Sequence, residues 1–92
     1  MSAKTGSIIL DGNPSGDPDV AIVLKIVDAL RETRLEKKLT LRDLKEKMGI
    51  SYAHLSRAER GLSHPGLVVL LRWCRALDLS FGDLLKQASV DQ

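Results

Sequence analysis

Helical spacing of apolar residues, interrupted at short intervals by cap and stop residues, is the feature that most constrains this chain. From residue 19 onward, Ile22, Ile26 and Leu30 recur every four positions and give one broad apolar face on a helix. Cap and stop residues then follow at Thr40, Gly49, Ser51, Gly61 and Ser80. No segment alternates as a convincing strand would. The sequence therefore predicts an all-α bundle of five short helices.

The predicted helices cover residues 20–37, 41–48, 52–60 and 65–77, and a fifth begins after Ser80. Pro65 suits the first turn of the fourth helix, where its missing N–H costs no hydrogen bond. The residues expected to face the core are Ile22, Val23, Ile26, Val27, Leu30, Leu41, Leu44, Met48, Ile50, Leu55, Ala58, Leu67, Leu70, Trp73, Cys74, Leu77, Phe81, Leu84 and Leu85.

Length and composition favour one helical domain. The 92 residues fit a single domain, and 43% hydrophobic but only 3% aromatic residues imply a core of Leu, Ile, Val and Ala. The single cysteine excludes an internal disulfide and a Cys-rich zinc site, which favours a reducing cytoplasm. No apolar run approaches the roughly 18 residues of a membrane span, and no signal-peptide pattern follows the first residues. We therefore expect a cytoplasmic protein without a membrane partner.

Charge divides the chain into three parts. Residues 1–19 contain one Lys against three Asp, whereas residues 20–90 contain 13 Lys and Arg against eight Asp and Glu. Gly, Pro and Asp dominate residues 11–19, so we expect 1–19 to be a mobile arm, 20–88 the folded domain and 89–92 a tail. The apolar residues 8–10 could pair with a partner chain or be disordered. A basic domain favours binding to nucleic acid, although charge alone does not establish it.

A three-residue turn, Gly49-Ile50-Ser51, joins the second and third predicted helices. Only a short turn sets two helices at a steep angle, which lets the second helix protrude and enter a major groove. The outward residues of that helix are Tyr52, Ala53, Ser56, Arg57 and Arg60.

Five spaced segments extend this pattern: 30–34, 39–44, 48–51, 54–61 and 65–70. Their order and gaps resemble the lambda-repressor-like helix-turn-helix of Cro and XRE-type regulators, over about residues 22–87. The resemblance implies a five-helix DNA-binding domain in a bacterial or phage transcription regulator. It further implies a homodimer that binds double-stranded DNA at a palindromic operator, with repression as the expected outcome.

The resemblance also implies roles for individual residues. Tyr52, Ala53 and Arg57 occupy base-reading positions, and the side chains expected to contact the DNA backbone are Thr40, Arg42, Ser51, Ser56, Arg60 and Ser63. Helix 41–48 would point its N-terminus at a phosphate. Arg34 and Glu59 match a structural ion pair, the alternative being two independent solvated charges. Asp78 stands where a glycine normally ends the fourth helix, in a left-handed conformation.

Catalysis and metal binding have little support in the sequence. Ser51, His54 and Asp43 are residue types used in nucleophilic catalysis, but their positions are those of a cap, a helix surface and a first-turn charge. His54, His64 and Cys74 lack the spacing of metal ligands. No Gly-rich loop follows a strand, so no nucleotide site is expected. We therefore expect neither an enzyme nor a cofactor.

The strongest competing hypothesis is a protein-interaction module on the same fold, such as an antitoxin, with weak or no DNA binding. It rests on the number of apolar residues in the first helix. Residues 22–27 contain more apolar side chains than one core face needs. Val68, Val69 and Leu71 lie where the family commonly has polar residues, so we expect an exposed apolar surface there. That surface would serve a homodimer or another protein partner, unless it is additional core beneath the arm.

Overall fold

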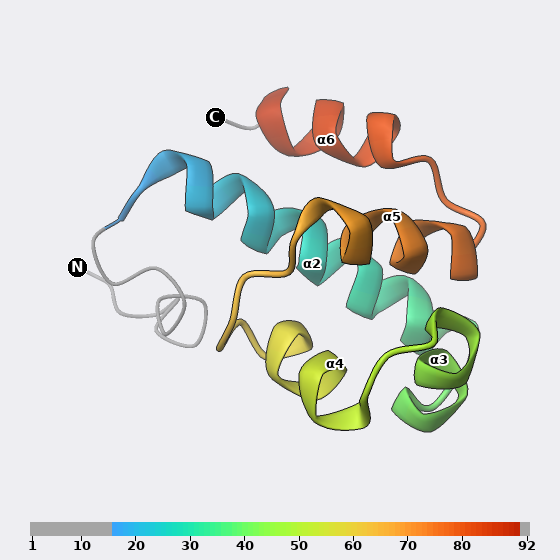
Figure 1. Cartoon of the computed structure of the whole chain (residues 1–92). Coiled ribbons are helices and arrows are strands. Elements are labelled where there is room, and N and C mark those ends of the chain that lie inside the picture. The colour runs from blue at the N-terminus through green and yellow to red at the C-terminus, as the bar shows by residue number, and fades with distance from the viewer. Residues whose placement is uncertain (1–15, 91–92) are drawn as a thin grey trace.

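The computed structural model describes residues 16–90, which form five α-helices and no strand (Figure 1). The helices are α2 (Pro18–Glu36), α3 (Leu41–Met48), α4 (Tyr52–Glu59), α5 (Leu67–Ala76) and α6 (Phe81–Val90). The all-α prediction is confirmed. Most of the predicted arm, and residues 91–92 of the predicted tail, lie outside the described residues.

Helix α2 begins earlier than predicted because Asp17 caps it. The Asp17 carboxylate accepts the N–H groups of Asp19 at 2.8 Å and Val20 at 3.5 Å, and a proline occupies the first turn. Pro18 and Asp19 are therefore helical rather than part of an arm.

Helix α5 begins later than predicted. Gly66 is the N-cap in an extended conformation, so Pro65 lies in the preceding loop, where it is buried, and Leu67 becomes the first helical residue. Leu67 is 59% exposed, and Leu85 on α6 is 41% exposed, so both inward predictions are wrong. Leu67 is the first residue of α5, and Leu85 lies at the edge of the buried face of α6.

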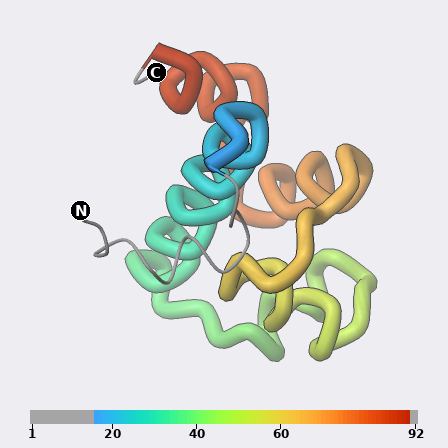
Figure 2. Tube along the Cα trace, turned by 90° about the vertical axis from the view of Figure 1, so that its left-hand side faces the viewer, coloured from blue at the N-terminus to red at the C-terminus, as the bar shows by residue number. Residues whose placement is uncertain are grey.

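The helices pack around one core. Helix α2 contacts α4 and α6, α3 contacts α4 and α5, and α5 contacts α6. Figures 1 and 2 show α6 at one end of the domain and the α3–α4 pair at the other. The largest fully buried side chains are Trp73, Leu30, Leu44, Leu55 and Leu77.

The prediction that α2 has more apolar side chains than the core needs is wrong, because α4 and α6 both pack against this helix. Leu24 is 7% exposed, and Ile22 and Val23 pack against the core from partly buried positions. Since α4 and α6 both contact α2, this helix needs more than one apolar face.

Cys74 is buried on the inner side of α5, as predicted. Burial raises the pKa of its thiol, because the apolar surroundings disfavour the thiolate. Within residues 16–90, no three side chains of His, Cys, Asp or Glu converge into a metal-binding group. None of the described helices combines the length and apolar character needed to cross a bilayer.

Two left-handed residues end helices as the sequence predicts. Gly49 has φ 70° and closes α3, with its N–H donating to the Lys45 carbonyl at 2.8 Å. Asp78 has φ 59° and follows α5. A short polar side chain tolerates this conformation better than a bulky one.

Replacing Gly49 tests this turn. A Cβ built at Gly49 meets no atom within 4 Å, so the penalty for Gly49→Ala comes from the backbone alone. We expect it to lower the free energy of unfolding by about 1 kcal/mol, measured by urea denaturation. Gly49→Asn should lower the free energy of unfolding by less, because Asn tolerates the left-handed region. Equal stability of the alanine variant and the parent would contradict this explanation.

Candidate nucleic-acid interface

Helix α4 is short, and its ends are stabilised by its own residues. The Ser51 hydroxyl accepts the His54 N–H at 3.1 Å, which caps the N-terminus. At the other end α4 stops at Glu59, one position before the predicted end. Arg60 is the C-cap residue, and its Nε donates to the Ser56 carbonyl at 3.4 Å. An eight-residue helix needs such support, because isolated helices of this length are unstable in water.

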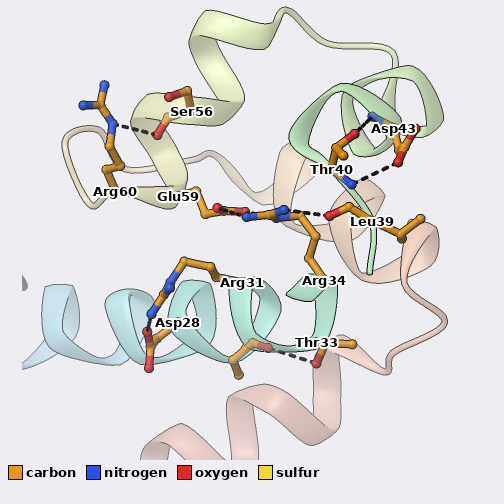
Figure 3. A network of polar contacts seen from close by, with 11 residues as sticks. Asp28, Arg31, Thr33, Arg34, Leu39, Thr40, Asp43, Ser56, Glu59 and Arg60 are labelled. Carbon is orange, nitrogen blue, oxygen red and sulfur yellow. Dashed lines mark hydrogen bonds and ion pairs between the residues drawn. The ribbon is translucent and has the colours of Figure 1, made fainter. Parts of the chain in front are cut away.

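A buried ion pair fixes α4 against the rest of the domain. Arg34 on α2 donates from Nε and Nη2 to the two carboxylate oxygens of Glu59, each at 2.8 Å (Figure 3). Its Nη1 donates to the Leu39 carbonyl at 2.7 Å. The two charged side chains are 11% and 6% exposed. One guanidinium thus joins α2, the end of α4 and the loop that leads into α3.

The outward residues of α4 share one face. At 3.6 residues per turn, Tyr52, Ala53, Ser56, Arg57 and Arg60 fall within an arc of about 140°. Tyr52 is 49% exposed, and Ala53, Arg57 and Arg60 are also exposed. The opposite side of the helix is buried through Leu55 and Ala58. Among residues 16–90, no carboxylate pairs with the Arg57 guanidinium, so its donors face solvent.

The N-terminus of α3 differs from the expected phosphate site. Thr40 and Asp43 form a reciprocal capping box, in which each side chain accepts the other's backbone N–H at 3.0 Å (Figure 3). The Thr40 N–H lowers the pKa of the Asp43 carboxyl, and the Thr40 hydroxyl and Lys47 lower it further. A carboxylate therefore already occupies part of this helix end and weakens its attraction for a phosphate.

Three more of the predicted contacts can be placed. Arg42 is exposed on α3, and Ser56 is half-buried on α4. The Ser63 hydroxyl is buried and has no hydrogen-bond partner within residues 16–90, so it is not presented for a phosphate contact. The loop fold that buries it was not evident from the residues themselves.

The predicted apolar surface on α5 is present but differs in membership. Val68 is 62% exposed and Leu71 is 41% exposed. Val69 is half-buried and packs against the core, so its assignment to this surface is wrong. Leu67, the first residue of α5, is exposed in its place. We call Leu67, Val68 and Leu71 the α5 patch.

The sequence did not predict the contact between Arg34 and the Leu39 carbonyl. The Leu39 carbonyl accepts from Arg34, although nothing in the residue type of Leu39 signals this role. Lys38 has φ 59° just before it, which turns the backbone after α2. A non-glycine residue in a left-handed conformation leaves no clear trace in a single sequence.

Comparison with known proteins agrees with this geometry. The Helix-turn-helix family matches residues 30–84, which is more than half of the chain. The chain belongs to the helix-turn-helix family.

A curated relative carries the same family name. It is the uncharacterized HTH-type transcriptional regulator y4dL of Sinorhizobium fredii, which is 41% identical over 54 residues. The match covers 59% of this chain but 28% of the relative. The helix-turn-helix of the family corresponds here to α3, the 49–51 turn and α4, as predicted.

Removing one partner of the Arg34–Glu59 pair tests its role in the helix-turn-helix domain. Glu59→Ala leaves a largely buried guanidinium without its carboxylate, so the free energy of unfolding should fall by about 3 kcal/mol in urea denaturation. The double variant Arg34→Met/Glu59→Leu should lose less free energy of unfolding, because it leaves no unpaired buried charge. A single-variant loss below about 0.5 kcal/mol would show the pair to be dispensable.

Acid should remove the contribution of the capping box. The folded state lowers the pKa of Asp43 below its ordinary value of 3.8, so its stabilisation is complete above that pH and is lost as the pH falls through the folded pKa. The stability difference between the parent and Asp43→Asn, from urea denaturation between about pH 7 and about pH 3, should therefore shrink in acid. A difference independent of pH would refute this.

Proposed function

We propose that this chain is a sequence-specific DNA-binding transcription repressor, which reads a palindromic operator as a homodimer through α4. The observation that carries the proposal is the outward face of α4, where an exposed guanidinium and aromatic ring project from a helix fixed by the Arg34–Glu59 pair. The family of the chain supports the same role. We expect the activity at operator DNA in a bacterial cytoplasm.

Base reading is assigned to Tyr52, Ala53 and Arg57. The planar guanidinium of Arg57 has no carboxylate partner in the described chain, and two of its donors match O6 and N7 of guanine. Ala53 and the Tyr52 ring offer apolar contact to a thymine methyl group. Tyr52 and Ala53 lie in the first turn of α4, the part of a recognition helix that approaches the bases, and Arg57 lies on the same face in its last turn.

Phosphate contacts are assigned to Thr40, Arg42, Ser51, Ser56 and Arg60. The hydroxyl of Ser51 accepts a backbone N–H as a cap and retains an O–H that can donate to a phosphate oxygen. The Thr40 hydroxyl also accepts a backbone N–H, and its O–H would have to turn from the Asp43 carboxylate to a phosphate. Arg42 and Arg60 are exposed and add positive charge. Ser63 is omitted because its hydroxyl is buried. Such contacts position the protein without reading sequence.

Dimerisation is assigned to the α5 patch. Leu67, Val68 and Leu71 expose three apolar side chains at adjacent positions on one helix, which favours burial against a second copy. A two-fold dimer would present two copies of α4 about 34 Å apart to half-sites one helical turn apart. Repression would follow if the operator overlaps a promoter.

The second candidate function is a protein-interaction module with weak DNA binding. The exposure of the α5 patch favours it, since the same residues could bind a different protein. The two functions differ in salt dependence. Specific DNA binding requires log affinity to fall linearly with log salt concentration, whereas apolar docking does not.

Arg57→Ala tests base reading. On DNA selected by the parent protein from a random pool, this variant should lose about 1 to 3 kcal/mol of binding free energy in an equilibrium titration. It should also lose preference at one symmetric base pair. Two matched controls are Arg60→Ala, which should weaken all sequences alike, and Lys86→Ala on α6, at the opposite end of the domain, which should change little (Figure 1). Uniform weakening by Arg57→Ala would make Arg57 a phosphate contact instead.

Val68→Asp tests the α5 patch. A carboxylate at this 62% exposed position should not disturb the core but should block burial against a second copy. Sedimentation should show the parent as a dimer at high micromolar concentration and the variant as a monomer. Val90→Asp, at a 74% exposed position on α6, is the matched control and should remain dimeric. A monomeric parent, both free and on DNA, would exclude the dimer.

A further inference from the structure

An open groove lies at the end of the domain farthest from α4. It runs between α2 and α6 and has a volume of about 620 Å³. Residues 18–29 of α2 and 85–90 of α6 lie outside the part of the chain that the family match covers. Residues 1–15 are also outside that match and join the domain at the start of α2. Parts of α2 and α6 that lie outside the family match therefore line this groove together.

The lining of the groove is largely apolar. Its apolar residues are Ala29 from α2 and Leu84, Ala88 and Val90 from α6. Val90 is 74% exposed and Leu84 is half-buried, so α6 leaves part of this surface open to solvent. The charged residues of the lining are Lys25, Asp28, Glu32 and Lys86, two of each sign. The groove thus suits a short apolar segment.

We propose that residues 8–10 bind in this groove of their own chain. Ile8, Ile9 and Leu10 are three consecutive apolar residues, and Asp11 follows them directly. Burial of the three side chains against the groove is favoured by the hydrophobic effect. The inference concerns the end of the domain opposite the proposed DNA-binding helix and does not depend on DNA binding.

The length of the chain permits this contact. Lys25 lies seven residues into α2 from Pro18, a distance of about 10 Å along the helix axis at 1.5 Å per residue. The eight residues from Leu10 to Pro18 span up to about 26 Å when extended. Gly16 has φ 74° just before α2, a left-handed conformation that changes the chain direction there. The segment can therefore fold back and reach the groove.

A spin label near the segment tests the contact in the full chain. The nitroxide is attached to Ser7→Cys in a Cys74→Ala background, and amide signals are compared before and after the label is reduced. We expect intensity loss at residues 25–29 and 84–90. Unlabelled ¹⁵N protein mixed with spin-labelled ¹⁴N protein should show no loss, because the contact is within one chain. If Cys74→Ala unfolds, Cys74 is retained, since its thiol is buried and its pKa is raised.

Variants separate binding from chance proximity. Ile8→Ser/Ile9→Ser/Leu10→Ser should abolish the intensity loss, and so should Val90→Asp, which changes an exposed residue at the groove. The matched control Ala3→Ser/Thr5→Ser should retain it. Loss confined to amides next to Gly16 would overturn the proposal. Loss in the mixed sample would also overturn it, because the segment would then bind a second copy.

Discussion

The Arg34–Glu59 pair is the interaction on which the arrangement of the helix-turn-helix depends. Helix α4 has eight residues and buries mainly Leu55 and Ala58, so its packing area alone is small. The guanidinium bonds both carboxylate oxygens of Glu59 and the Leu39 carbonyl, which fixes the end of α4 and the entry to α3 with one side chain. Bidentate geometry adds direction to the attraction between the charges. A recognition helix needs such a fixed orientation, because contacts to base edges tolerate little displacement.

The sequence predicts the fold well where local chemistry decides it. Helix α3 begins and ends where Thr40 and Gly49 predict, because a capping box and a left-handed glycine are local devices. The start of α5 was predicted two residues early, since nothing local decides between Pro65 as a first-turn residue and Pro65 as a buried loop residue. The exposure of Leu67 and the packing of Val69 against the core depend on which neighbours cover each end of α5, and the residue period does not determine that. Leu24 was misjudged because its burial depends on neighbours distant in sequence.

The candidate site was predictable to the extent that it follows from helix geometry and family resemblance. The outward placement of Tyr52, Ala53 and Arg57 follows from the period of α4. The Arg34–Glu59 contact follows from the resemblance, because the residues are 25 positions apart. The burial of the Ser63 hydroxyl and the role of the Leu39 carbonyl depend on loop conformation, which residue types do not determine. The Asp43 carboxylate was predicted as first-turn charge, but its effect on the phosphate site required the observed contact with Thr40.

The central claim is that α4 enters the major groove and that Arg57 contacts guanine there. Methylation of guanine N7 by dimethyl sulfate reports directly on that groove, because N7 is accessible only from the major-groove edge. On DNA selected from a random pool, the bound protein should protect one guanine N7 in each half-site, and Arg57→Ala should lose that protection while it remains bound at higher concentration. Unprotected guanines under saturating parent protein, or protection unchanged in Arg57→Ala, would contradict the claim.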